Sequence, residues 1–220
     1  MTKEYFGDWI KVIDFNELIR VMKVISPLYN IKSICPNKEL VFKAFTLCSL
    51  QDLKIVFLGQ DPYPQKGVGT GILFGNKEGT EMSPSLQIIK EAVINFEVPH
   101  NNIIFVPTLE SWARQGILMI NSAFTVEENK IGSHTMLWRP FVSKLLINLS
   151  KCYTGIIYVL FGREAQSFSH FIGPNNYILK EKHPAYYART NTKMPHQLFI
   201  DINNLVYNTY DEKIEWYKEY

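Results

Sequence analysis

The sequence is poor in cysteine and has no cysteine pattern that binds a metal. Its three cysteines, Cys35, Cys48 and Cys152, are odd in number and far apart. This spacing matches neither a disulfide framework nor the paired Cys/His ligands of a structural zinc site. We therefore expect three buried thiols and no metal site.

Long hydrophobic runs are also missing. No apolar stretch approaches the roughly 18 residues that a membrane-spanning helix needs. The N-terminal segment MTKEYFGDWI has acidic residues where a secretion signal has its apolar core. We expect neither membrane insertion nor export, and thus an intracellular, cytoplasmic protein.

Neither sign of charge is in large excess. The 23 basic and 21 acidic side chains give a formal net charge of +2, less than a dedicated electrostatic nucleic-acid binder usually has. Hydrophobic residues make up 46% and charged residues 20% of the chain, proportions typical of a folded domain and not of a disordered one. The charge balance leaves the function open.

The chain has no repeats, low-complexity segments or long linkers, so its 220 residues predict a single domain, residues 1–220. Short apolar runs rich in β-branched residues predict four strands, at 54–59, 117–121, 155–162 and 177–180. Helical spacing predicts a helix at 15–25, ended by Pro27, and further helices at 39–50, 83–96, 137–149 and 197–207. This alternation predicts an α/β fold with three layers, α/β/α, around a central four-stranded, mainly parallel sheet.

Polar residues follow the predicted strands, where ligands bind in such a fold. Asp61, Asn121 and His183 each follow a different strand, so the topology would gather them at one end of the sheet. Singly, Asp61 is equally a helix cap or turn residue, and Asn121 a strand-end turn. Taken alone, His134 is expected to cap a helix or stay solvated, and Gly162-Arg163 to be an ordinary loop.

Other reaction classes lack their motifs. The chain has no GxSxG serine elbow, no HExxH zinc motif and no cysteine with suitable partners, which argues against acyl transfer and metal-dependent hydrolysis. The glycines at 67, 69 and 71 have neither P-loop nor GxGxxG spacing. Nucleotide-cofactor binding is therefore a weak match, and a flexible substrate loop is the alternative.

At these residues the chain resembles the family 1 uracil-DNA glycosylases. The resemblance covers roughly Ile55 to Ile200 and rests on blocks that agree in order: GQDPYP (59–64), SPS (83–85), LESWARQGILMINSAFTV (109–126), GSH (132–134), FGREAQ (161–166) and HPAYYA (183–188). It implies hydrolysis of the N-glycosidic bond of deoxyuridine in DNA after base flipping. The products would be free uracil and an abasic site for base excision repair, and the reaction would need no metal or organic cofactor.

The resemblance also implies roles for individual residues. Asp61 would stay ionised, stabilise the cationic sugar and orient the attacking water, while His183 would donate a hydrogen bond to the uracil 2-carbonyl. Uracil would be bound by Gln60, Tyr63, Phe74 and Asn121. DNA would be contacted by Ser83, Pro84, Ser85, Gly162, Arg163, Pro184, Ala185 and Tyr187.

Three of the uracil-binding side chains would have separate tasks. Asn121 would read the pairing edge, donating to a carbonyl and accepting from the imino hydrogen. Tyr63 would occupy the space that the methyl group of thymine needs, and Phe74 would stack on the flipped ring. Core packing is the alternative for both rings.

Two positions depart from the family's pattern. Pro64 stands where histidine is usual, and Tyr187 stands where a leucine commonly inserts into the vacated base stack. An aromatic wedge would fill that gap by stacking, or Tyr186 and Tyr187 would contact the DNA surface differently.

The expected partners are uracil-containing DNA, single- or double-stranded, and free uracil as product. The resemblance adds a proteinaceous glycosylase inhibitor as a partner, and we expect a monomer. Two other functions stay open: a catalytically silent DNA-binding or replication-accessory module with this fold, and a glycosylase for thymine mismatches or other lesions. Retention of Asp61, Asn121 and His183 argues against the first, and the bulk of Tyr63 argues against the second.

Overall fold

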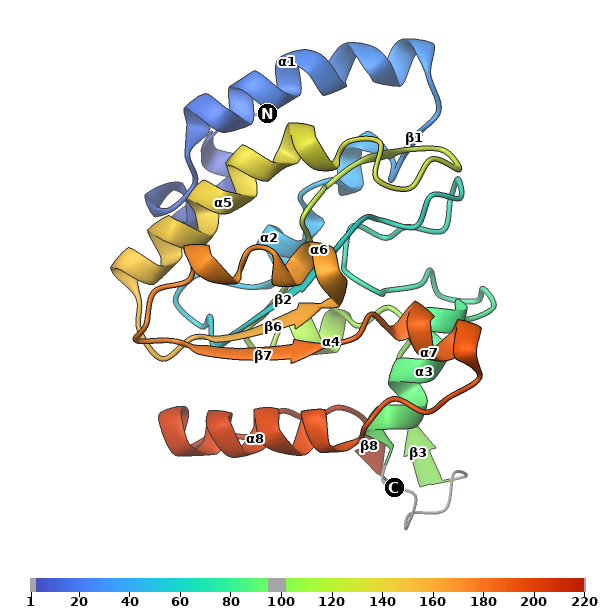
Figure 1. The fold of residues 1–220 in the computed structure, drawn as a ribbon, viewed down its shortest axis with the longest axis vertical. Coiled ribbons are helices and arrows are strands. Elements are labelled where there is room, and N and C mark those ends of the chain that lie inside the picture. Colours follow the sequence, from blue (N-terminus) through green and yellow to red (C-terminus); the bar gives the residue numbers. More distant parts are fainter. Residues whose placement is uncertain (1–2, 95–101, 220) are drawn as a thin grey trace.

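The computed structural model describes residues 3–94 and 102–219 (Figure 1). At its centre lies a four-stranded sheet in the order β4-β2-β6-β7, made of β2 (Ile55–Gly59), β4 (Ile117–Asn121), β6 (Ile157–Phe161) and β7 (Tyr177–Glu181). Every pairing within it is parallel. The four predicted strands and the three-layer α/β/α arrangement are confirmed, and the sheet is parallel throughout.

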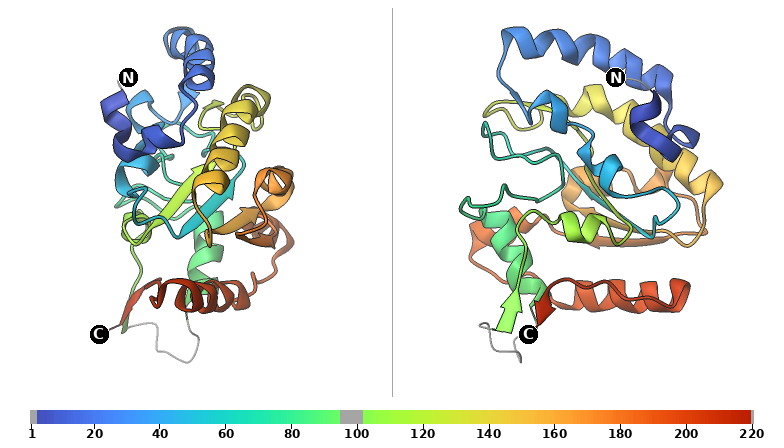
Figure 2. Two further views of the ribbon diagram at one scale, coloured as in Figure 1. Left: turned by 90° about the vertical axis from the view of Figure 1, so that its left-hand side faces the viewer. Right: turned by 180° about the vertical axis from the view of Figure 1, so that it is seen from behind.

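Helices cover both faces of this sheet (Figures 1 and 2). One face carries α1 (Phe15–Ile31), α2 (Lys43–Leu47) and α5 (Thr135–Cys152), and the other carries α3 (Pro84–Val93), α4 (Glu110–Ala113) and α8 (Gln197–Tyr210). Each face has its own hydrophobic core. Within β2, Val56 and Leu58 pack into the core on the α1 and α5 side, and Ile55 and Phe57 pack into the core on the α3 and α8 side. Because side chains alternate along a strand, a wholly apolar strand requires cover on both faces.

The first long helix does not end before Pro27, so that prediction is wrong. Helix α1 continues to Ile31 with Pro27 inside it. Val21 and Ile25 on its inner face are 0% exposed. Burying two such side chains offsets the roughly 3 kcal/mol that a proline costs inside a helix.

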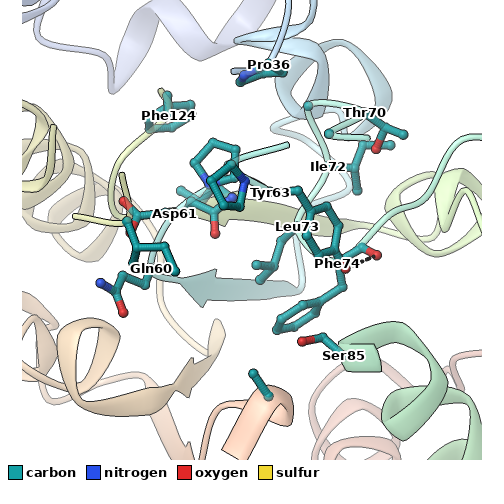
Figure 3. A pocket seen from close by; sticks show the side chains of 18 of the residues that line it. Pro36, Gln60, Asp61, Tyr63, Thr70, Ile72, Leu73, Phe74, Ser85 and Phe124 are labelled. Carbon is teal, nitrogen blue, oxygen red and sulfur yellow. Dashed lines mark hydrogen bonds between the residues drawn. The ribbon is translucent and has the colours of Figure 1, made fainter. Parts of the chain in front are cut away.

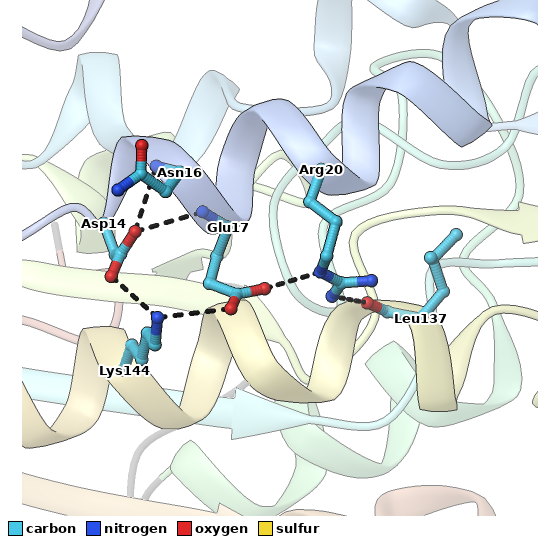
Figure 4. A network of polar contacts seen from close by, with 6 residues as sticks. All are labelled: Asp14, Asn16, Glu17, Arg20, Leu137 and Lys144. Atoms are coloured by element: carbon cyan, nitrogen blue, oxygen red, sulfur yellow. Dashed lines mark hydrogen bonds and ion pairs between the residues drawn. The ribbon is translucent and has the colours of Figure 1, made fainter.

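Charged side chains hold α1 against α5 (Figure 4). Asp14 caps α1 by accepting the backbone N–H of Glu17 at 3.0 Å. From α5, the Nζ atom of Lys144 lies 3.0 Å from Asp14 and 3.2 Å from Glu17. Arg20 pairs with Glu17 at 2.6 Å. This network ties the outer helix to the layer beneath it.

The single helix predicted over residues 39–50 is also wrong. The segment breaks into η2 (Lys38–Leu40) and α2, with Phe42 between them at φ −115° and ψ 18°. The Phe42 ring packs edge-on against Phe6, 5.3 Å between centroids. On the other side the Leu40 carbonyl presses on Gly71, where a Cβ atom would come within 1.9 Å. Tertiary packing on both sides overrides the local helical pattern.

Several short elements complete the fold and were not predicted. Two-residue strands pair β1 (Ile34–Cys35) with β5 (Val126–Glu127) and β3 (Ile103–Ile104) with β8 (Lys218–Glu219). The short helices are η1 (Lys3–Lys11), η4 (Ser169–Phe171), α6 (Gly162–Gln166) and α7 (Pro184–Thr190). Apart from η1, which is kinked at Gly7 (φ 51°), elements of this length are too short to show a hydrophobic period. Phe96, the predicted end of the 83–96 helix, lies outside the described residues.

The three thiols differ in burial. Cys35 and Cys48 are buried, as predicted, but Cys152 is exposed, so the prediction for it is wrong. Cys152 is the last residue of α5, where the helix has passed beyond the core that buries Leu149. In the part of the chain that the structure describes, no helix is long and apolar enough to cross a membrane.

Candidate active site

A cavity of about 280 Å³ lies at the carboxyl ends of the central strands (Figure 3). Its wall brings together Asp61, Asn121 and His183, which come from the segments at or after β2, β4 and β7. Other predicted site residues on the wall are Gln60, Tyr63, Phe74, Ser85 and Ala185. The volume lies just below the roughly 300–1,000 Å³ range of sites for drug-sized molecules, so it suits a small ligand.

The loop that carries Asp61 is tied to the segment after β4. The Gln60 carbonyl accepts the backbone N–H of Ala123 at 2.9 Å, and the Pro64 carbonyl accepts that of Asn129 at 3.0 Å. These bonds begin and end the GQDPYP loop. Asp61 therefore projects from a rigid turn and not from a free loop.

The carboxylate of Asp61 has one held and one available oxygen. Oδ2 accepts the backbone N–H of Gly132 at 2.8 Å. Oδ1 is buried and has no hydrogen-bond partner of normal geometry among the described residues. Burial raises the pKa of Asp61 to about 6, and the Gly132 N–H opposes that rise by stabilising the charged form. The group is therefore mostly ionised at pH 7.

His183 is held as a neutral imidazole of one tautomer. It caps α7, and its Nδ1 accepts the backbone N–H of Ala185 at 3.2 Å. Burial lowers its pKa to about 4, with a smaller effect from the positive charge of Arg189. A neutral ring with Nδ1 as acceptor carries its proton on Nε2, which leaves Nε2–H as a donor.

Two neighbours restrict where the His183 ring lies. Gly162 has a φ of +84°, and a Cβ there would come within 3.1 Å of the His183 Cβ. The Phe74 ring lies edge-on to the imidazole, with 5.4 Å between centroids. A side chain at position 162 would therefore shift His183 by a few tenths of an ångström.

Asn121 ends β4 beside the last residue of β2. It pairs in register with Gly59. A Cβ at Gly59 would lie 2.7 Å from Oδ1 of Asn121 and 2.3 Å from Leu73, so only glycine leaves room for the amide. Within the described residues that Oδ1 is buried without a hydrogen-bond partner. An unpaired buried acceptor of this kind indicates a place for a ligand donor.

Tyr63 is fixed at its hydroxyl end. The hydroxyl donates to the Phe74 carbonyl at 3.1 Å and lies 2.5 Å from Oγ of Ser83. Ser83 in turn caps α3 by accepting the N–H of Leu86 at 3.2 Å. Phe74 has the left-handed φ of 64°, a strained conformation that this packing sustains. Both rings on the cavity wall are thus held in place.

The predicted DNA-contact residues have different environments. Pro84 and Arg163 are exposed, and Ser83, Gly162 and Ala185 are half-buried. Ser85 is 7% exposed but lies on the cavity wall. Pro184 and Tyr187 lie on α7, and both are buried in the protein.

One contact of the site was missed in the sequence, and one nearby residue was partly misread. Gly132, part of the GSH block, holds Asp61 through its backbone, which no side-chain pattern reveals. Arg189 lies on the cavity wall. His134 is the N-cap residue of α5, as one of the two expectations had it, although its side chain makes no capping hydrogen bond. It is 5% exposed with Nδ1 2.9 Å from the Thr125 hydroxyl, so the expectation of a solvated histidine is wrong.

The cavity wall carries charge-bearing groups suited to separating charge. Asp61 offers a negative charge, and His183 offers a neutral donor that strengthens as negative charge develops opposite it. Among residues 3–94 and 102–219, no cluster of three or more His, Cys, Asp or Glu side chains is arranged to hold a metal ion.

Residues 45–206 match the family model of the uracil DNA glycosylase superfamily. The chain belongs to the uracil-DNA glycosylase superfamily. It is 33% identical over 218 residues to the uracil-DNA glycosylase of Buchnera aphidicola subsp. Acyrthosiphon pisum, covering 98% of this chain and 93% of that one. Identity to the enzyme of Campylobacter lari is 34% over 198 residues, or 87% and 83% of the two chains.

Solved structures of the superfamily share the fold. A variant of mimivirus uracil-DNA glycosylase in complex with UGI superimposes with a TM-score of 0.81 at 25% identity, over 98% of this chain and 91% of that one. The mimivirus uracil-DNA glycosylase itself gives a TM-score of 0.76 at 24% identity, over 97% and 90%. The superfamily fold therefore extends across nearly the whole chain.

Proposed function

We propose that this chain is a uracil-DNA glycosylase that hydrolyses the bond between uracil and deoxyribose in DNA. The products are free uracil and an abasic site for base excision repair. The observation that carries the proposal is one cavity, sized for a base, whose wall holds an ionised carboxylate, a neutral imidazole and an amide with an unpaired acceptor. Membership of the superfamily supports the same activity.

Asp61 stabilises the sugar side of the breaking bond. As uracil departs, positive charge develops on the deoxyribose in an oxocarbenium-like transition state. The Gly132 N–H holds Oδ2, and Oδ1 accepts no hydrogen bond of normal geometry from the described residues, although the side chains of Gln60 and Thr135 lie near enough to lower the pKa of Asp61. Oδ1 is therefore free to orient the attacking water while the charge stabilises the cation.

His183 stabilises the base side. Its Nδ1 is engaged by the Ala185 N–H, so Nε2–H donates to the uracil 2-carbonyl as negative charge gathers there. With a pKa near 4 the ring is neutral at pH 7 and acts as a hydrogen-bond donor, not as a source of a full proton. Asp61 and His183 thus stabilise opposite charges.

The remaining wall residues select uracil. Asn121 pairs with the uracil edge through its amide, whose Oδ1 has no protein partner among the described residues. Tyr63, pinned at its hydroxyl, blocks the methyl group of thymine. Phe74 and Gln60 complete the base pocket. A mismatched polar edge in such a closed pocket costs about 1–3 kcal/mol.

DNA lies across the loops that surround the cavity. We assign phosphate and backbone contacts to Ser83, Pro84, Ser85, Gly162, Arg163 and Ala185. Hydroxyls, backbone amides and one arginine grip phosphates without a large basic surface, which fits a net charge of +2. Pro184 and Tyr187 are buried, and we assign them to shaping the loop that carries His183.

Further proposals concern the protein as a whole. We propose that it works as a monomeric, single catalytic domain of residues 1–220, in the cytoplasm, on single- or double-stranded DNA. A mimivirus relative has been solved with UGI, and we propose that a proteinaceous glycosylase inhibitor also binds this chain. The proposed mechanism uses no metal or organic cofactor.

One assay tests the function. The protein is incubated in chelator with oligonucleotides that contain uracil, thymine opposite guanine, or no lesion, and abasic sites are then cleaved with alkali. We expect cleavage only of the uracil-containing strands. Cleavage at thymine would indicate a mismatch glycosylase, and binding without any cleavage would indicate a silent DNA-binding module. Either result overturns the proposal.

A further inference from the structure

The tyrosine at the position of the family's inserting leucine is not presented to solvent. Tyr187 lies on α7 and is 7% exposed, whereas its neighbour Tyr186 is 38% exposed. The two rings meet edge-on, with 5.4 Å between centroids. Tyr187 packs in the core cluster that α7 shares with α3, so inserting it between DNA bases would require it to leave that core.

A short hydrogen bond holds Tyr187 at its hydroxyl end. The hydroxyl donates to Oε1 of Glu181 at 2.6 Å. Burial, and then this carboxylate, raise the pKa of Tyr187, so the phenol stays protonated and remains a donor. A hydrogen bond from a hydroxyl to a carboxylate is among the stronger bonds of a protein.

Glu181 is itself anchored to the central sheet. It is the last residue of β7 and pairs in register with Phe161 of β6. Its carbonyl accepts Nε2 of Gln166 at 2.8 Å, and its Oε1 also accepts the backbone N–H of Lys182 at 2.6 Å. The carboxylate therefore presents a fixed acceptor to α7.

His183 lies inside the span that this bond closes. Glu181 precedes it by two residues and Tyr187 follows it by four, on the helix that His183 caps. We infer that Tyr187, through Glu181, is a positioning residue that orients the His183 imidazole for the reaction. This inference rests on the proposed function, and it replaces base-stack insertion as the task of Tyr187.

The physical reason is that Nε2–H must point at one carbonyl oxygen. The His183 ring turns with the first turn of α7, because Nδ1 bonds to the Ala185 N–H of that turn. The Tyr187 hydroxyl fixes the next turn to the sheet, and therefore fixes the direction of the helix. A small rotation of a catalytic donor costs rate without weakening the grip on DNA.

The decisive variant is Tyr187→Phe, which keeps the ring and removes the hydroxyl. Single-turnover rates are measured on a single-stranded oligonucleotide with one deoxyuridine, where no duplex stack exists to be filled. We expect the maximal rate to fall about tenfold with an unchanged half-saturating enzyme concentration. If Tyr187 instead inserted its ring into the base stack, Tyr187→Phe would keep that ring and would show the wild-type rate.

Tyr210→Phe is the matched control. The Tyr210 hydroxyl is also bonded within the protein, to the Gly155 carbonyl at 3.1 Å, but at the opposite end of β6 from the cavity. We expect a melting temperature lowered by no more than in Tyr187→Phe, because this bond is to an uncharged acceptor, and a wild-type rate. A loss of rate in both variants would indicate a general loss of stability and overturn the positioning role.

Variants of Glu181 test the other end of the bond. Glu181→Gln keeps an acceptor oxygen and should retain much of the rate, whereas Glu181→Ala should lose as much as Tyr187→Phe. The double variant Glu181→Ala/Tyr187→Phe should lose little more rate than either single variant, because each substitution removes the same hydrogen bond.

The outcomes separate this inference from the proposed function. If the wild-type protein does not excise uracil, the proposed function fails. If the wild-type protein excises uracil, and Tyr187→Phe is as fast on single strands, the positioning role is wrong. A loss seen only on duplex DNA, and only when the ring is removed in Tyr187→Ala, would restore the wedge.

Discussion

Asp61 occupies an environment that favours its neutral form, although the proposed reaction uses its charge. Burial raises its pKa to about 6, which lies above the value of 3.8 for an unperturbed aspartate. Above pH 6 the folded protein holds a partly desolvated carboxylate that the unfolded chain would solvate freely. Activity at this residue is therefore gained at the expense of stability.

Replacing Asp61 with asparagine should separate these two effects. We expect Asp61→Asn to lower the single-turnover rate at least about 100-fold, because the sugar cation loses its counter-charge, with little change in DNA affinity. The melting temperature of the variant relative to wild type should be higher at pH 8 than at pH 4, because only the wild type loses stability as the pH rises through about 6. An unchanged rate would remove Asp61 from the mechanism.

Asn121 tests how the base edge is read. The substitution Asn121→Asp provides a carboxyl group that, when protonated, offers the edge that cytosine needs. We expect uracil excision to fall about 10- to 100-fold and slow excision of cytosine to appear. Release of each base from matched oligonucleotides, measured by chromatography, checks this. If neither base is released, the edge-reading role of Asn121 is unsupported.

At the scale of elements, the site depends on junctions where a strand gives way to a helix. Gly162 begins α6 directly after β6, with a φ of +84° that suits glycine. His183 occupies the neighbouring junction, where β7 ends and α7 begins, and it is the N-cap residue of α7. A side chain at position 162 would force these two junctions apart by a few tenths of an ångström.

Gly162→Ala should therefore impair catalysis more than stability. The new Cβ would lie 3.1 Å from the His183 Cβ and push the imidazole out of line. We expect a rate loss of about tenfold or more on single-stranded substrate. The control is Gly79→Ala, which has a similar φ of +74° and no atom within 4 Å of the new Cβ. Equal rate losses in the two variants would mean that backbone strain, not contact with His183, is responsible.

At the scale of the whole molecule, two buried groups set the response to pH. Asp61 has its pKa raised to about 6, and His183 has its pKa lowered to about 4. Between these values the protein carries a protonated Asp61 and a neutral His183. As the pH falls, the negative charge of Asp61 is therefore lost before His183 becomes protonated.

The pH–rate profile should show a single acidic limb between pH 5 and 7. We expect the single-turnover rate to rise with pH through an apparent pKa of about 6 and then to level off, because Asp61 must be ionised. His183, with its pKa near 4, becomes protonated only at a pH below the range of this limb. Rates on single-stranded substrate from pH 4.5 to 9 measure it. A rate independent of pH across 5–7 would contradict the assignment.

The central strands were predictable because they are short and flanked by turn residues, and because all but β7, which ends in Lys180 and Glu181, are almost wholly apolar. The placement of Asp61, Asn121 and His183 at one cavity also followed, because parallel strands bring their carboxyl ends to the same edge. The course of α1 past Pro27 was not predictable. It depends on burial of the inner face of the helix, where Val21 and Ile25 enter the core, and not on the local pattern around the proline.

The sequence by itself determined the α/β class. It also determined which polar residues follow which strand, and therefore which side chains are available at the site. These features depend on hydrophobic periodicity and motif order, which are local properties. Tertiary structure alone decided which of them are held and how. The Gly132 N–H fixes Asp61, Ala185 selects the His183 tautomer, and Glu181 draws Tyr187 inward. These contacts use backbone N–H groups, or side chains that meet only because the folded backbone brings them together, and burial in a shared cavity changes pKa values in ways that no linear pattern encodes.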